Sequence, residues 1–220
     1  MQAGLPSLPR GVALTALVPL PALKTRCGEG VGMAACPALG LLVTSNRKDN
    51  TLSVFKLPKS VRPHVGGGAG DGAGLELVCT LGAAYSPAPM RLRFDDGDYS
   101  GWMAFTGPAT SRLLLLTDAG HDAVHVIDVA GRVHTGYVAA PGTIAGPRGV
   151  AARGSLVAVS AWKNRDSGDH VVRVFEGSGA MWTAVRVVGG GFRGPGSAHG
   201  QLKVPCGLRF TGDGAGLAVA

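Results

Sequence analysis

The sequence repeats itself, and this repetition restricts the chain to a small group of folds. One copy spans residues 147–176 and contains Pro-Arg-Gly-Val-Ala, an apolar run, a charged polar turn and a second apolar run. The same order of features begins upstream at Val31 and at Pro89, and downstream at Pro205. Self-similarity at a period of tens of residues is typical of architectures in which each repeat buries its apolar face against the next one.

Each copy also has the strand content of a propeller blade. The prolines that open three of the copies lie 58 residues apart. With the insertions removed, a copy approaches the ~40–45 residues of a four-stranded blade, and Gly, Pro, Asn and Asp separate its short β-rich runs. We therefore predict an all-β fold, a partial β-propeller of four-stranded antiparallel blades. The predicted repeats are 31–88, 89–146, 147–204 and an incomplete 205–220.

Two further expectations concern the strands. Because strands in the middle of stacked blades are covered on both faces, six side chains of the central runs should be buried. They are Leu41, Val43, Leu114, Leu116, Val157 and Val159. The first strands should begin near Met33, Met90, Gly149 and Gly207. Thr117 and Ser160 end their runs at equivalent places, which indicates structural hydroxyls rather than nucleophiles.

Two stretches resemble a known family of propellers. Residues 117–131 resemble the second and third strands of an NHL repeat, and residues 194–208 resemble the Gly-rich lead-in and first strand of the next one. The resemblance covers residues 31–220 and is strongest from 113 onwards. It implies a propeller that recognises a protein or RNA through loops on one face. The first copy departs from the pattern, with Ser45 and Asn46 where the family has Asp.

The ends of the chain and its cysteines give further expectations. Residues 1–30 are apolar but broken by proline, so we expect a loose or degenerate blade and no membrane span. Three copies and part of a fourth fall short of the 4–8 blades of a closed ring, so missing blades of a longer protein or another chain should complete it. Cys27, Cys36, Cys79 and Cys206 show no paired spacing, which favours reduced thiols in an intracellular compartment.

Catalytic and metal-binding patterns are weak. The six histidines do not follow the 58-residue period, so the repeat does not gather them around a channel. His121 and His125 are four residues apart, and on a turn followed by a strand this spacing separates them by about 13 Å. We predict no catalytic residues, no metal and no cofactor. A propeller lyase or hydrolase with a channel-bound metal is the alternative.

The charge of the chain gives the clearest functional indication. A net charge of +7 and a pI near 9.6 favour acidic partners. In the first and third copies, the turn between the second and third strands carries cations at the same position. We therefore predict a partner-binding face on a module that recognises a protein, an acidic peptide or RNA, such as the substrate-recruiting arm of a ubiquitin ligase. Its residues are Arg47, Lys48, Lys163, Asn164 and Arg165.

Overall fold

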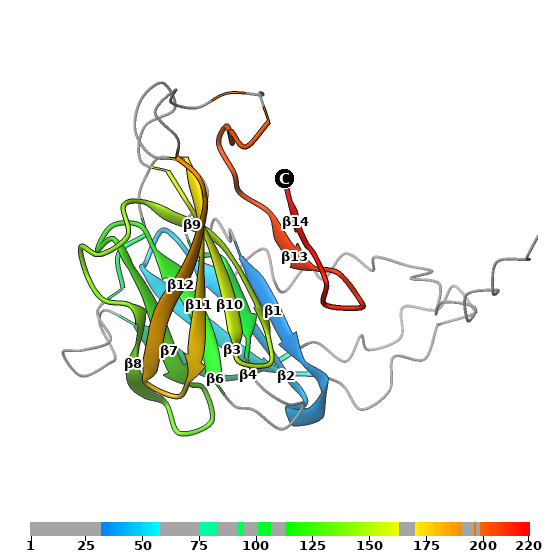
Figure 1. Cartoon of the computed structure of the whole chain (residues 1–220). Helices are drawn as coiled ribbons and strands as arrows, with labels where there is room; N and C mark the ends of the chain where they lie inside the picture. Colours follow the sequence, from blue (N-terminus) through cyan, green and yellow to red (C-terminus); the bar gives the residue numbers. More distant parts are fainter. Residues whose placement is uncertain are drawn as a thin grey trace, which may run out of the picture.

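The chain forms a partial β-propeller. The computed structural model describes residues 32–57, 75–82, 92–94, 101–106, 113–162, 170–190, 196 and 199–220. In this part of the chain, three four-stranded antiparallel sheets and one two-stranded sheet follow one another (Figure 1). Within each sheet the strands lie side by side in the order of the sequence. The fold class predicted from the repeats is therefore confirmed.

The first blade contains β1 (Met33–Cys36), β2 (Leu41–Asn46), β3 (Thr51–Lys56) and β4 (Glu76–Gly82), with the short helix η1 (Pro37–Leu39) between β1 and β2. The second contains β5 (Met103–Phe105), β6 (Leu113–Asp118), β7 (Ala123–Asp128) and β8 (Val133–Ala139). The third contains β9 (Pro147–Arg153), β10 (Leu156–Ala161), β11 (Val171–Ser178) and β12 (Met181–Gly189). The fourth sheet has β13 (Leu208–Phe210) and β14 (Leu217–Val219).

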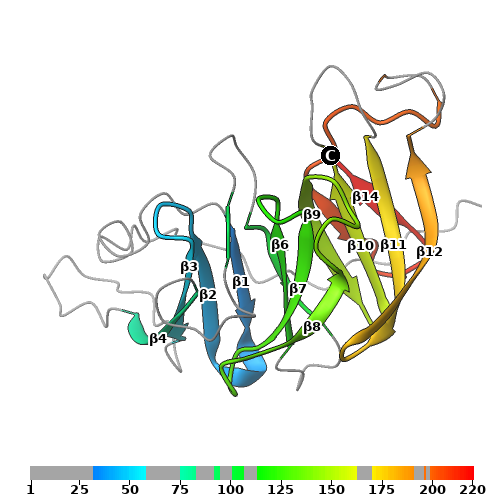
Figure 2. The ribbon, with the colours of Figure 1, turned by 90° about the vertical axis from the view of Figure 1, so that its left-hand side faces the viewer.

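The blades are placed side by side in chain order (Figure 2). Their first strands make successive contacts, β1 with β5, β5 with β9 and β9 with β13, so they line a common inner wall. The core lies between neighbouring blades. Leu114 and Leu116 of β6 pack toward the first blade, while Leu115 between them packs toward the third. The central strand β6 therefore has a continuous run of leucines in its sequence, because both of its faces are covered.

Five of the six predicted core residues have at most 1% of their surface exposed, and only Leu41, at the start of β2, is half-buried. The first strands begin at Met33, Pro147 and Leu208, close to the predicted positions. In the second blade the prediction near Met90 was wrong, because the strand that pairs with β6 is Met103–Phe105. Residues 92–94 form no strand and instead bond to the turns of the first two blades.

Equivalent hydroxyl groups join the second blade to the third and the third blade to the fourth sheet. The Ser160 hydroxyl accepts a hydrogen bond from the Gly149 N–H at 2.8 Å and donates to the carbonyl of Cys206, in the next blade, at 3.1 Å. Thr117 holds the equivalent position on β6, and its hydroxyl donates to the carbonyl of Arg148, again in the next blade, at 2.8 Å. Both side chains are fully buried. The expectation that these hydroxyls are structural is therefore confirmed.

A second set of contacts joins the blades at the turns between second and third strands. Three residues at the same position of the repeat each accept a backbone N–H from the lead-in of the next blade. Asn50 accepts from Phe94 at 2.6 Å, Asp122 accepts from Gly146 at 2.8 Å, and Nδ1 of His170 accepts from Val204 at 2.7 Å. An amide, a carboxylate and an imidazole thus perform one role, because the position requires only a hydrogen-bond acceptor.

Candidate functional site

The partner-binding face predicted from sequence lies partly within the described structure. Arg47 and Lys48 occupy the β2–β3 turn, where Arg47 is half-buried and Lys48 is exposed. Lys163, Asn164 and Arg165 lie outside the described residues. The strands on either side of them, β10 and β11, pair in the same way as β2 and β3, so both connections leave their blades at the same end.

The register of the strands refines the equivalence between these two turns. Ser45 pairs with Leu52 in the first blade, and Ser160 pairs with Val172 in the third. Counting onward from these serines, Arg47 corresponds to Trp162 rather than to a lysine. Trp162 is buried, and the guanidinium carbon of Arg148 lies 4.6 Å from the centre of its ring. This geometry is that of a cation–π contact.

A cation that the sequence comparison missed lies at the second blade. The turn at 119–122 carries no Lys or Arg, which predicted a gap in the basic face. In the structure, the exposed Arg93 lies against this turn: its carbonyl accepts the Gly120 N–H at 3.0 Å, and a Cβ at Gly120 would collide with the Arg93 side chain. We call Arg47, Lys48 and Arg93 the basic rim. Sequence periodicity could not find Arg93, because it belongs to the lead-in of its blade.

Next to the basic rim, a group of titratable side chains surrounds a buried carboxylate. Asp118 is fully buried and its Oδ2 accepts hydrogen bonds from His121 Nδ1 at 2.9 Å and His125 Nε2 at 3.1 Å. The other ring nitrogen of His125, Nδ1, lies 3.1 Å from His134 Nε2, and a hydrogen bond joins the two rings. Tyr137 packs against the rings of His125 and His134.

This geometry corrects the expectation that His121 and His125 lie far apart. Both reach the same carboxylate, because Asp118 is the last residue before the turn and His121 folds back onto it, while His125 returns on the paired strand. Asp118 also accepts the backbone N–H of Arg93 at 3.0 Å. The carboxylate therefore orients both histidine rings and holds the lead-in that carries Arg93.

The environment of the group shifts two pKa values. Burial by itself would raise the pKa of Asp118, but the hydrogen bonds from His125 and His121 outweigh it and hold this pKa below its usual value. Burial and the nearby His125 charge lower the pKa of His134 to about 4. Near neutral pH, Asp118 is therefore ionised and His134 is neutral.

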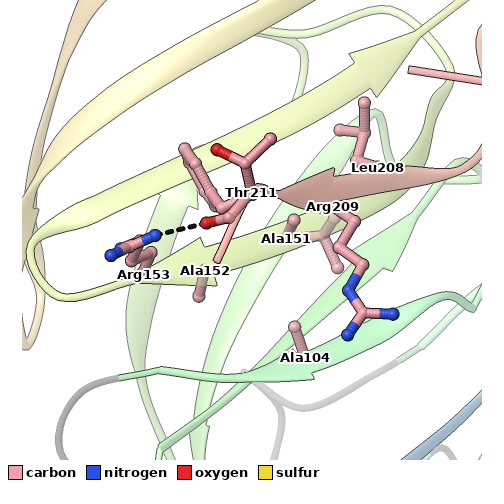
Figure 3. Close-up of a pocket in the computed structure, with 9 residues that line it drawn as sticks. Ala104, Ala151, Ala152, Arg153, Leu208, Arg209 and Thr211 are labelled. Carbon is pink, nitrogen blue, oxygen red and sulfur yellow. Dashed lines mark hydrogen bonds between the residues drawn. The ribbon is translucent and has the colours of Figure 1, made fainter. Parts of the chain in front are cut away.

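A pocket lies at the inner wall, among the first strands of three blades. It has a volume of about 460 Å³ and is lined by residues of β5, β9 and β13 and by Thr211. Arg153 and Arg209 are the charged residues of its lining. Arg153 donates a hydrogen bond to the Thr211 carbonyl, while Arg209 extends in another direction, toward Ala104 (Figure 3). Arg153 ends β9, so this part of the pocket lies at the opposite end of the blades from the basic rim.

Other kinds of site were sought in the same residues. In the described part of the chain, no three His, Cys, Asp or Glu side chains are grouped so that they could hold a metal ion. No disulfide joins Cys36, Cys79 and Cys206, while Cys27 lies outside the described residues. Among the helices that the structure describes, none has the length and apolarity needed to cross a membrane.

Comparisons with known proteins support the fold. No protein-family model matches the sequence, and no curated protein is significantly similar. Hydrazine synthase of Kuenenia stuttgartiensis is similar in structure, with a TM-score of 0.54, 13% identity, and 95% of this chain covered against 45% of that one. The propeller of nidogen, from a nidogen–laminin complex, has a TM-score of 0.53 at 13% identity, with 88% of this chain and 57% of that one covered.

The Cps50 (Swd1) β-propeller domain of Myceliophteria thermophila matches at a TM-score of 0.46 and 12% identity, with 88% and 63% covered, and a score this low carries no argument. At 13% identity the other two similarities concern the fold alone. The chain spans about half the length of these two structures. The likeness is to β-propeller proteins in general and does not single out the NHL family.

Proposed function

We propose that this chain is a non-catalytic binding module whose basic rim recognises an acidic segment of a partner protein. The observation that carries the proposal is the position of Arg93 against Gly120. It brings a cation to the second blade, at the end of the blades where Arg47 and Lys48 extend the first. Lys163, Asn164 and Arg165 add the third blade to the proposed surface.

Two of the acidic side chains at this end make their hydrogen bonds within their own blades. The carboxylate of Asp118 is buried and bonded to two histidines, and that of Asp49 accepts from Asn46 Nδ2 at 2.8 Å. Separate cations projecting from turns of adjacent blades would attract an acidic chain laid across them and raise its rate of association. Such contacts would be exposed to solvent and screened by ions, so the affinity for the acidic segment should depend strongly on salt.

A protein partner is favoured over RNA by the composition of the chain. Sequence-tolerant binding of single-stranded RNA uses aromatic platforms for the bases, whereas aromatic residues make up 5% of this sequence. The Trp162 ring is buried beneath Arg148. The recruiting arm of a ubiquitin ligase, which the NHL resemblance implies, is a role of this kind.

Binding to a fluorescein-labelled polyglutamate peptide tests the proposal. Fluorescence anisotropy should show saturable binding at low salt that weakens steeply as salt rises. Reversing charge at Arg47 and Lys163 together, as R47E/K163E, should weaken binding by about tenfold or more, and adding R93E should weaken it further. The matched control reverses two cations away from the rim, with Arg132→Asp on the β7–β8 turn and Arg186→Glu on β12.

If the rim variants and the control lose affinity equally, net charge rather than the rim drives binding, and the proposed site is wrong. A random single-stranded RNA pool provides the second comparison. Tight binding of RNA with no binding of the peptide would overturn the choice of a protein partner.

A further inference from the structure

The pocket at the inner wall differs from the basic rim in both position and chemistry. Its lining combines the small side chains of Ala104, Ala151 and Ala152 with two arginines and the β13 strand. The alanines leave a hollow where the first strands of three blades approach one another (Figure 3). A volume of about 460 Å³ lies in the range of sites for small molecules.

The walls of this hollow are strand edges. β9 is the last strand of its sheet and pairs only with β10, and β13 pairs only with β14, as far as the described residues show. In an antiparallel edge strand, alternate residues direct their N–H and C=O groups away from the paired neighbour. Backbone N–H donors of β9 and β13 therefore face the inner wall beside the pocket.

The two arginines contribute unequally to the charge of the pocket. Arg153 bonds to the Thr211 carbonyl and packs so closely on Gly214 that a Cβ there would collide with its guanidinium group. Asp213, which is held by Thr211 and Ala215, lies near enough to Arg153 to feel its charge. Arg209 is exposed, and in the described part of the chain no hydrogen bond or ion pair holds its guanidinium group. It is the less compensated cation of the pocket.

We propose that this pocket binds a small oxyanion, with Arg209 as its principal ligand and Arg153 and the backbone N–H groups of the strand edges as further donors. Guanidinium groups and N–H groups are the donors that carboxylate and phosphate oxygens prefer. The site is separate from the basic rim, so a test of one does not decide the other.

Titrations followed by amide NMR test the site and identify the oxyanion. Inorganic phosphate and succinate are added separately at constant ionic strength, and the amide signals of Ala152 and Thr211 are followed. At least one probe should cause saturable shifts at these positions. Saturation by phosphate alone assigns a phosphate site, saturation by succinate alone assigns a carboxylate site, and saturation by both assigns a site for either oxyanion.

Three variants test the role assigned to Arg209. Arg209→Gln should raise the dissociation constant about tenfold or more, because a hydrogen bond to a charged group is lost. Arg209→Lys should retain part of the affinity. Arg186→Gln on β12 makes the same change in net charge away from the pocket and should alter the constant by less than about twofold. No saturable shift with either probe, or equal affinities for Arg209→Gln and the unaltered chain, would overturn the proposal.

Discussion

Replacing Ser160 by alanine should destabilise the contact between the third blade and the fourth sheet. The hydroxyl is fully buried and bridges the Gly149 N–H and the Cys206 carbonyl. Alanine leaves the buried N–H group without its acceptor, and an unsatisfied buried donor costs about 1–3 kcal/mol. For a chain of this length, each kcal/mol corresponds to roughly 2–4 °C in Tm. We therefore expect the Tm of S160A to fall by roughly 2–12 °C.

Thermal unfolding followed by circular dichroism measures this change. The control S178A removes an exposed hydroxyl at the end of β11 and should shift Tm by less than about 1 °C. Thr117→Ser keeps the bridging hydroxyl and removes only a buried methyl group, so it should cost about 0.8 kcal/mol. An S160A protein that is as stable as the unaltered chain would refute the reasoning that these hydroxyls join the blades.

Three other predictions concern the same contacts and the buried histidines. His170→Asn should preserve the hydrogen bond to the Val204 N–H, since Asn50 accepts the equivalent bond in the first blade. His170→Ala should remove this bond and speed hydrogen exchange of the Val204 amide. Equal exchange rates in both variants would contradict the shared role. Gly149→Ala should destabilise the protein by more than Gly212→Ala in denaturant unfolding, because a Cβ at Gly149 collides with the Cys206 carbonyl and one at Gly212 meets nothing. The pKa of His134 is lowered from 6.5 to about 4 in the folded state, so the unfolded chain binds a proton at a higher pH than the folded chain does. The free energy of unfolding should therefore fall as pH drops from about 6.5 to 4. His134→Gln should flatten that fall, whereas the control His199→Gln, at an exposed position, should not.

The fold could be predicted from the sequence because the residues that recur in each repeat are those that pack or join the blades. Val43, Leu115 and Ala158 hold the same place in three blades and are all fully buried, because blades stack on both faces of each central strand. Thr117 and Ser160 recur because each must bridge to the next blade. Such requirements act on every repeat, so they leave a periodic signal.

The candidate sites were less predictable because their contacts do not follow the period. Arg93 reaches the basic rim from a lead-in whose length is particular to the second blade. The histidine group depends on strand register: His125 pairs with Leu116, and Tyr137 pairs with His125, which spacing along the chain does not reveal. Likewise, Asn50, Asp122 and His170 share a role but no residue type, so comparison of residue identities misses them.

The central claim is that successive blades pack through equivalent close approaches at their first strands. Through-space contacts between blades test this claim most directly. Gly32 meets the backbone of Gly101 and Trp102, and Gly149 meets that of Cys206. NMR spectra of the labelled chain should therefore contain nuclear Overhauser effects between the α-protons of Gly32 and Trp102, and between those of Gly149 and the backbone of Cys206. Their absence, in spectra that retain the contacts between paired strands such as β2 and β3, would mean that the blades form without packing in this order, and would contradict the propeller arrangement.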